Sequence, residues 1–198
     1  MKTIGLIGGM SWESSAHYYR ILNQETARRL GGPHSAPVIM HSVDFAPIAE
    51  MQSAGNWDAA GRQLNTVAQG LVRAGAEVLG LATNTMHVVS DIMLEGVATP
   101  FIHIADPTAQ ALLGDGYDTV GLLGTRFTME MDFYKQRLVS HGLNVLVPEV
   151  DHTNLNGIIY EELCKGIVRE ESRRTYQAAI DRMAARGAQA VILGCTEI

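Results

Sequence analysis

Two short polar segments combine residue types that could act on a small anionic ligand. Thr83-Asn84-Thr85-Met86-His87 follows one apolar run, and Gly194-Cys195-Thr196-Glu197 follows another. A cysteine thiolate can remove or return a proton where neighbouring donors lower its pKa. Hydroxyl groups and unpaired backbone N–H groups at the start of a helix suit a carboxylate. The combination favours proton transfer at a small carboxylate ligand without a cofactor.

An internal repeat makes Thr83 and Cys195 equivalent positions. Residues 75–85 align with residues 187–197, and residues 3–9 align with residues 119–125. Each half opens with an apolar strand that ends in a glycine-containing turn. Two halves related in this way can face each other across one cleft. We therefore expect Thr83 and Cys195 to serve opposite sides of one ligand.

Apolar runs of strand length alternate with helical patterns along the chain. We expect strands at 3–7, 36–42, 77–82, 101–104, 118–123, 143–147 and 189–194, and helices at 13–30, 58–74, 86–95, 107–113, 127–141, 155–165 and 171–186. Most of the strand segments are continuous runs rich in Val, Ile and Leu, as in parallel strands covered on both faces. Asp58 and Asp106 are candidate helix N-caps.

This alternation predicts an α/β fold of two pseudo-symmetric α/β/α lobes with mostly parallel sheets and the active-site cleft between them. The first lobe is expected over residues 1–105 and the second over residues 106–198. No low-complexity linker separates them.

Composition and charge narrow the class of partner. The 198 residues carry a net charge of −6 and no run of Lys and Arg, which argues against nucleic acid or an anionic membrane as a partner. No apolar run is long enough for a transmembrane helix, and the N-terminus enters a strand without the apolar region of a signal peptide. Cys164 and Cys195 are the two cysteines, so no disulfide framework is implied. We expect a cytoplasmic protein.

Each feature also has an ordinary structural interpretation. Gly8-Gly9 is typical of a tight turn between strand and helix, and it lacks the spacing of a dinucleotide or phosphate loop. His87 taken alone indicates a structural histidine, and Cys164 lies in an apolar helical pattern that predicts a core position. Trp12, Glu13 and His103 carry no separate signal. The internal repeat is the reason to interpret Thr83 and Cys195 as functional residues and not as ordinary structural ones.

The paired motifs resemble those of the aspartate/glutamate racemase family, which has Cys-Asn-Thr-x-His in the first half and Gly-Cys-Thr-Glu in the second. The segments at 8–11, 42–45 and 124–128 are also similar, and the resemblance covers the chain from its first residue to its last. It implies racemisation of aspartate or glutamate by two bases, without pyridoxal phosphate or metal, usually in a homodimer.

The resemblance assigns roles by position. Cys195 matches one of the catalytic bases, and Thr83 stands where the other would be. The positions matched to substrate binding are Met10, Asn84, Thr85, Thr125, Thr128, Lys165 and Thr196, with Arg20 and Gln52 as weaker candidates. Lys165 would bind the side-chain carboxylate of the substrate. Asp44, His87 and Glu197 are supporting neighbours that would orient or assist the bases.

Two departures from the family pattern bear on activity. Thr83 replaces a cysteine, and a hydroxyl is a much weaker acid than a thiol, so we expect an asymmetric enzyme that favours L-substrates, with a proton relay through Asp44 or His87 as one hypothesis. The chain also stops at Ile198, directly after the second motif, where family members usually continue with a segment that packs onto the first lobe.

Several functions remain open at this stage. The leading prediction is an acidic amino-acid racemase. The main alternative is a catalytically impaired or non-catalytic protein that binds acidic amino acids or dicarboxylates. Isomerisation of maleate, racemisation of hydantoins and nucleotide binding are weaker alternatives.

Overall fold

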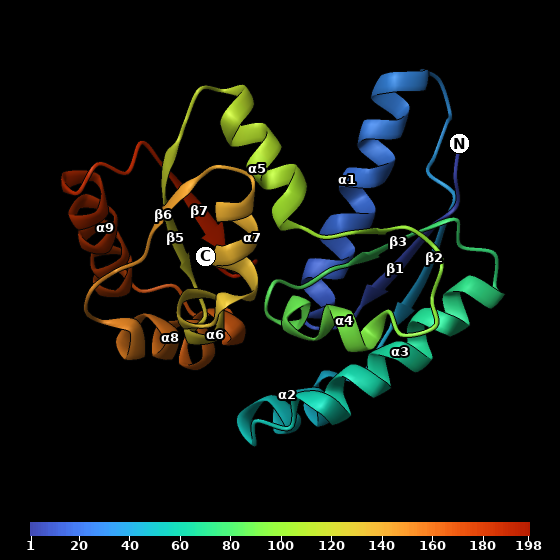
Figure 1. The fold of residues 1–198 in the computed structure, drawn as a ribbon, viewed down its shortest axis with the longest axis horizontal. Helices are drawn as coiled ribbons and strands as arrows, with labels where there is room; N and C mark the ends of the chain where they lie inside the picture. Colours follow the sequence, from blue (N-terminus) through green and yellow to red (C-terminus); the bar gives the residue numbers. More distant parts are fainter. The chain divides into compact units, whose positions relative to one another are not determined.

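The computed structural model describes residues 1–198 as two compact units, Met1–His103 and Ile104–Ile198 (Figure 1). The boundary expected from the sequence, between residues 105 and 106, would cut the helix α5 (Ala105–Gly114), which belongs to the second unit. Each unit is a parallel sheet with its own helices, which is the α/β class predicted from the alternating pattern. None of the helices combines the length and apolar character needed to cross a membrane.

The first unit contains a four-stranded parallel sheet in the order β2-β1-β3-β4. Its strands are β1 (Ile4–Gly8), β2 (Val38–Ser42), β3 (Val78–Leu81) and β4 (Phe101–Ile102), and its helical segments are α1 (Trp12–Leu30), α2 (Phe45–Ser53), α3 (Trp57–Arg73), the 3₁₀ segment η1 (Thr85–Val89) and α4 (Ser90–Met93).

Alternation along β1 places α1 and α3 on opposite faces of this sheet. A Cβ at Gly5 would meet Leu71 of α3, whereas a Cβ at Gly8 would meet Ser15 of α1. Successive residues of a strand point to opposite faces, so residues 5 and 8 belong to different faces. The main core lies on the α3 side, where Ile7 and Leu79 are fully buried.

The second unit contains a three-stranded parallel sheet in the order β6-β5-β7. Its strands are β5 (Thr119–Gly124), β6 (Asn144–Leu146) and β7 (Ala190–Gly194). Besides α5, its helical segments are α6 (Arg126–Glu130), α7 (Asp132–Ser140), α8 (His152–Glu161), the 3₁₀ segment η2 (Leu163–Lys165) and α9 (Glu170–Ala185). The order β6-β5-β7 matches the order β2-β1-β3 of the first unit, as the sequence repeat requires.

In each unit, the turn after the first strand ends in a hydroxyl residue that caps the next helix. After β1, the Ser11 side chain caps α1 by accepting a hydrogen bond from the backbone N–H of Ser14. After β5, the Thr125 side chain caps α6 by accepting one from the backbone N–H of Thr128. In this arrangement the hydroxyl oxygen of the N-cap residue accepts a hydrogen bond from the backbone N–H three residues later, which would otherwise have no partner in the helix. Both turns thus use a hydroxyl cap, although Ser11 lies three residues after Gly8 and Thr125 directly follows Gly124.

Several boundaries differ from those expected. The helix α2 was not expected, because Pro47 obscures its pattern; a proline in the first helical turn removes no intrahelical hydrogen bond. The expected helix 127–141 is divided at Met131, whose ψ of 151° is extended. Asn56, not Asp58, caps α3, and the helix expected at 107–113 begins earlier, at Ala105, without a capping side chain from Asp106.

Gly9 is a position where the backbone itself requires glycine. Its φ is +95°, and a Cβ there would lie 2.2 Å from the carbonyl oxygen of Val43. We expect Gly9→Ala to lower the free energy of unfolding by about 2 kcal/mol or more, because both the left-handed conformation and the contact oppose a side chain. Chemical denaturation measures this change.

The control is Gly70→Ala in α3, where the nearest atom to an added Cβ is the end of the Arg73 side chain, 3.9 Å away. Replacing a helical glycine in open space should stabilise the protein by about 0.5–1 kcal/mol. Equal stabilities for the two variants would contradict the packing described for the β1 turn.

Candidate active site

The strand ends of the first unit bring Gly8, Ser42 and the segment after β3 to one edge of the sheet. Gly8 pairs with Ser42, and Ile7 pairs with Leu81. Beyond the regular pairs, Val43 N donates to the carbonyl oxygen of Gly8 over 3.0 Å, and Ala82 N donates to that of Ile7 over 2.8 Å. Thr83 therefore starts its turn at this edge, with 8% of its surface exposed.

Asn84 and Thr85 continue the turn from β3 into η1. Thr85 is buried. The Oδ1 atom of Asn84 is inaccessible to solvent and has no hydrogen-bond partner. An unsatisfied buried acceptor costs about 1–3 kcal/mol, so such an atom calls for an explanation. It is the single buried side-chain atom of this kind in the structure, and it lies next to Thr83.

The second unit repeats this arrangement with closer backbone packing. Gly124 pairs with Gly194, so Thr125 and Cys195 follow neighbouring strands at the same edge. A Cβ at Gly124 would lie 2.8 Å from the carbonyl oxygen of Gly194, and one at Gly194 would lie 2.6 Å from that of Leu123. Glycine at both positions lets the strand ends approach closely and fixes where Cys195 begins.

The Cys195 thiol is half-buried and held in its neutral form. Burial raises its pKa to about 12, because a low-polarity surrounding disfavours the thiolate. Hydrogen bonds from the backbone N–H groups of Glu197 and Thr196 lower the pKa, whereas the negative charge of the Glu197 side chain raises it. The N–H groups at the strand end suggested a thiol of low pKa. In this state burial outweighs those donors, so the pKa of Cys195 is raised instead.

Two tyrosines near Cys195 were not singled out in the sequence. Burial, together with negative charge on Cys195 and Cys164, raises the pKa of Tyr160 to about 12. Burial, followed by the same effect of Cys195, also raises the pKa of Tyr176, whose hydroxyl donates to the carbonyl oxygen of Leu155 over 2.9 Å. Both residues lie on helices far from the motif in sequence, so no spacing rule points to them.

Several of the predicted site residues carry structural contacts. Met10 is buried in the main core of the first unit. Gln52 is also buried, and its Nε2 atom lies 2.8 Å from the sulfur of Met86. Asp44 caps α2 through a hydrogen bond from Ala46 N. The hydroxyl oxygens of Thr125 and Thr128 are buried 3.2 Å apart within the α6 cap.

Other predicted residues lie at the surface. Arg20 is exposed on α1, with a guanidinium nitrogen 2.8 Å from the Nδ1 of His17. Lys165 is exposed, and its ammonium pairs with Glu161 over 2.6 Å. Thr196 is exposed, with its hydroxyl 3.5 Å from the Glu197 carboxylate. Cys164 is exposed as well, so the prediction that it is a core residue is wrong: its helix ends before it, and it falls in the short η2 turn.

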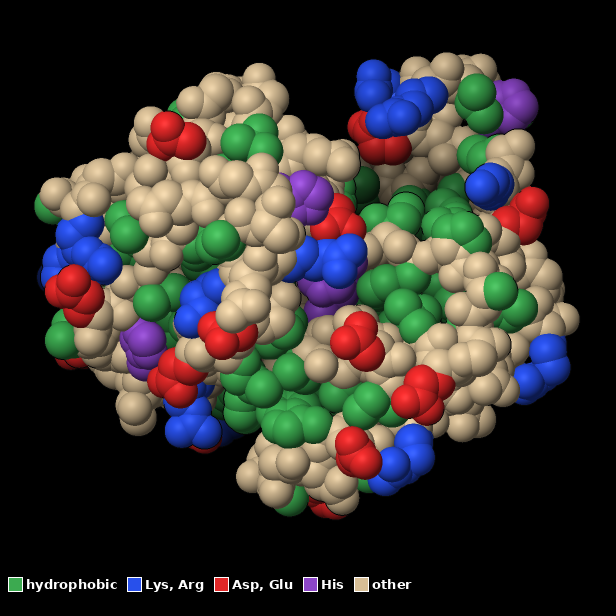
Figure 2. All heavy atoms as spheres, in the orientation of Figure 1, with side chains coloured by type: hydrophobic (Ala, Val, Ile, Leu, Met, Phe, Trp, Pro, Cys, Tyr) green, Lys and Arg blue, Asp and Glu red, His purple; other side chains and the backbone are tan.

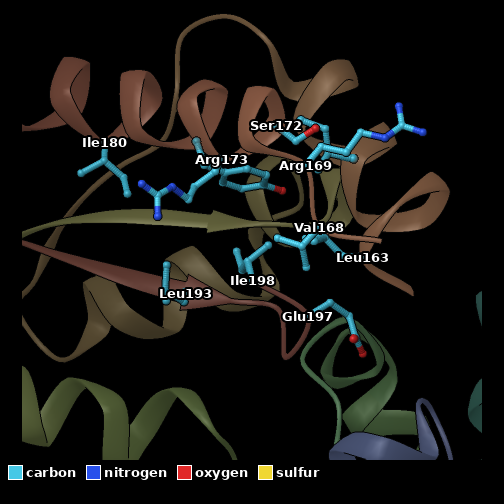
Figure 3. A pocket seen from close by; sticks show the side chains of 11 residues that line it. Leu163, Val168, Arg169, Ser172, Arg173, Ile180, Leu193, Glu197 and Ile198 are labelled. Carbon is cyan, nitrogen blue, oxygen red and sulfur yellow. The ribbon is translucent and has the colours of Figure 1, made fainter. Parts of the chain in front are cut away.

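A cavity of about 280 Å³ lies beside the end of β7 in the second unit (Figure 3). Its walls come from α8, η2, α9, β7 and the end of the chain, and it is lined by Ile158, Leu163, Val168, Arg169, Ser172, Arg173, Tyr176, Ile180, Leu193, Glu197 and Ile198. Its surface is mainly apolar, and Glu197 is the one predicted site residue among them. The predicted polar site therefore does not coincide with this cavity.

The charges form no continuous patch of one sign on the face in Figure 2, where Lys and Arg are interspersed with Asp and Glu. Many are paired on the surface, as in Arg62 with Asp58 and Arg137 with Asp106. No group of three or more His, Cys, Asp or Glu side chains is arranged to hold a metal ion.

Comparison with known proteins shows a family whose model matches nearly the whole chain, including these strand ends. The model of the Asp/Glu/Hydantoin racemase family matches residues 7–198. The chain belongs to this family. The match includes both motif segments and both strand-end turns.

Solved structures agree with this assignment. A candidate Asp/Glu racemase from Yersinia pestis is 49% identical with a TM-score of 0.93. An aspartate racemase homologue from Pyrococcus horikoshii OT3 is 36% identical with a TM-score of 0.81. The alignments with these two cover 100% of this chain and 86% of the other chain. A glutamate racemase from Francisella tularensis, solved with D-glutamate, shares the fold at 20% identity with a TM-score of 0.63, over 99% of this chain and 69% of its own. Family and neighbours indicate an amino-acid racemase.

The protonation state of Cys195 can be measured directly. In a Cys164→Ser background, we expect the alkylation rate of Cys195 to be still rising at about pH 10, because burial keeps the thiol neutral, whereas an unperturbed cysteine titrates near about pH 8.5. Iodoacetamide labelling followed by mass spectrometry over a pH series gives this profile. The same protein in denaturant is the control, and a plateau below about pH 9 in the folded protein would contradict the burial effect.

Proposed function

We propose that this protein racemises an acidic amino acid, aspartate or glutamate, without pyridoxal phosphate. Cys195 exchanges a proton with one face of the substrate Cα, and Thr83 serves the other face. Three observations support the proposal: the family match, the aspartate racemase homologue at 36% identity, and the equivalent positions of Thr83 and Cys195 after β3 and β7 of the repeated sheets. The observation that carries it is this equivalence of positions.

The chemistry requires the Cys195 thiol to lose its proton when substrate binds. The backbone N–H groups of Thr196 and Glu197 already favour the thiolate, although burial outweighs them. The ammonium group of an amino acid would add positive charge, which lowers the pKa of a nearby thiol. The thiol releases its proton to solvent, and the thiolate takes the Cα proton as the electron pair moves into the substrate carboxylate. The Thr83 hydroxyl then returns a proton to Cα from the opposite face and regains one from solvent through a hydrogen-bonded neighbour. Hydrogen-bond donors at the substrate carboxylate stabilise the developing charge.

The two proton abstractions, one on each face of Cα, are unequal in the proposal, although net racemisation has an equilibrium constant of 1 and the same kcat/KM in both directions. A threonine hydroxyl gives up its proton far less readily than a thiol, so Thr83 is a poor base but can still pass a proton through a hydrogen-bonded neighbour. Cys195 would therefore act well on one enantiomer and Thr83 poorly on the other. We assign the faster Cα–H exchange to L-substrates.

Asn84 is the substrate contact that the structure supports best. Its Oδ1 atom has no partner and is closed to solvent, so the proposal requires the turn to open on binding, when a substrate ammonium would supply the missing donor. Thr85, Thr125 and Thr196 are further candidates at the strand ends. Lys165 would have to leave Glu161 to reach a substrate carboxylate, because these two side chains form an ion pair at the surface.

Binding of acidic amino acids without turnover is the second candidate function. The raised pKa of Cys195 favours it, as does the hydroxyl at position 83, because neither group is a ready base at neutral pH. Ligand binding without loss of the Cα proton would identify this function.

The deciding experiment follows the Cα–H signals of L-Asp, D-Asp, L-Glu and D-Glu by proton NMR in deuterium oxide, with chiral analysis of the products. We expect exchange of an acidic amino acid, faster from the L-enantiomer. Cys195→Ala should reduce it by about 100-fold or more, because it removes the general base. Thr83→Cys should bring the D- and L-rates closer together.

Cys164→Ser is the matched control, since it removes the exposed thiol and should leave the rate unchanged. Undiminished exchange in Cys195→Ala would refute the role of Cys195, and rates as unequal as before in Thr83→Cys would refute that of Thr83. Ligand-induced shifts without any exchange would favour the binding function.

Asn84→Ala separates ligand binding from stability. Because the change removes an unsatisfied buried acceptor, we expect an unchanged or slightly raised melting temperature together with about tenfold weaker binding of the acidic amino acid. Calorimetry measures both quantities.

Asn65→Ala is the matched control for this prediction. The Asn65 amide donates to the carbonyl oxygens of Met93 and Glu95, so its loss should lower the melting temperature and leave ligand affinity unchanged. A large loss of stability in Asn84→Ala would show that Asn84 is a structural residue.

A further inference from the structure

A buried imidazole lies directly behind the turn that carries Thr83 and Asn84. The His87 side chain belongs to η1 and is 1% exposed. Its Nδ1 atom lies 2.8 Å from the carbonyl oxygen of Thr83 and 3.3 Å from that of Asn84. Carbonyl oxygens only accept hydrogen bonds, so Nδ1 must carry the proton and donate it. The contacts thereby assign the tautomer of the ring.

The ring is held in place by aromatic neighbours. The His103 ring is edge-on to it at a centroid separation of 4.4 Å, and the Phe101 ring lies 5.6 Å away. Phe101 is fixed in turn by the sheet, since it pairs with Leu79 in the register of β4 on β3. The imidazole therefore packs against a residue that is anchored to β3, and it also contacts the turn that follows β3.

The hydrogen bond to Thr83 constrains more than one atom. The peptide unit between Thr83 and Asn84 is planar and contains the Cα atoms of both residues. When its oxygen is held, rotation of the whole unit is restrained, and with it the direction of the Cα–Cβ bond at each residue. The backbone N–H of His87 adds a second contact by donating to the carbonyl oxygen of Asn84 over 3.1 Å.

We propose that His87, held by His103 and Phe101, is a positioning residue that fixes the backbone of the turn and so the directions in which the Thr83 and Asn84 side chains leave it. It does so by donating from Nδ1 to the backbone of the turn. Small displacements of reacting groups can reduce rates by about 100-fold, so this orientation would matter for turnover. That consequence rests on the proposed function. The orientation itself does not rest on it.

The test compares donors of different reach at position 87. In His87→Asn the side-chain nitrogen is bonded to Cγ, as Nδ1 is in histidine, so the donor is retained. In His87→Gln the nitrogen is one bond further out, and His87→Leu removes the donor. Three-bond NMR couplings between the backbone HN and Hα protons of Thr83 and Asn84 report whether the φ angle of each residue has one value.

We expect couplings of a single backbone conformation in the wild type and His87→Asn, and averaged couplings in His87→Leu. If His87→Leu fails to fold, His87→Gln replaces it, and averaged couplings are expected there too because its donor is displaced. In Cα–H exchange, kcat should fall by about 10–100-fold in the variants without the donor and recover in His87→Asn. Val67→Ala is the stability control, because it truncates a buried side chain of α3 in the same unit and should leave the Thr83 couplings unchanged.

Two outcomes would overturn the proposal. One is unchanged couplings in both His87→Leu and His87→Gln. The other is averaging in Val67→Ala of the same extent, which would make the effect one of general stability. A wild type that shows no exchange with any acidic amino acid would refute the proposed racemase function and leave the coupling measurement to decide the role of His87.

Discussion

The close approach of backbone at the strand ends is the constraint on which the rest of this structure depends. In the first unit, Gly9 adopts a φ of +95° and leaves no room for a Cβ beside Val43. In the second unit, Gly124 and Gly194 bring the ends of β5 and β7 together where any side chain would collide with a carbonyl oxygen. These contacts fix the turn after β1 in the first unit and, in the second, the point at which Cys195 leaves its sheet.

Polar residues around these turns combine structural and candidate functional roles. Thr125 and Thr128 satisfy the start of α6, and His87 satisfies the turn before η1, while the adjoining Asn84 keeps an unpaired acceptor. Buried polar groups are normally paired, and one that is not marks a place where stability has been given up. In this turn the satisfied groups surround the unsatisfied one, which is the pattern expected of a ligand contact held by a rigid support.

Burial and proton transfer oppose each other at Cys195. A surrounding of low polarity would strengthen the interaction of a thiolate with a substrate ammonium, but the same surrounding keeps the thiol neutral before that charge arrives. The two backbone donors at Thr196 and Glu197 offset only part of this effect. In the proposed reaction, such a thiol would become a base only when its ligand binds, which would link selectivity for a charged substrate to reactivity.

The sequence by itself determined the repeated α/β architecture, the strand ends and the two motif segments, because continuous apolar runs and glycine turns are local properties of the chain. It did not reveal α2, whose proline obscures the helical pattern, or the exposure of Cys164 and Lys165, which depends on where a helix ends. The pKa of Cys195 and the contacts of His87 with Phe101 and His103 were also beyond its reach. Burial and orientation are sums over neighbours from distant parts of the chain, and only the tertiary structure brings those neighbours together.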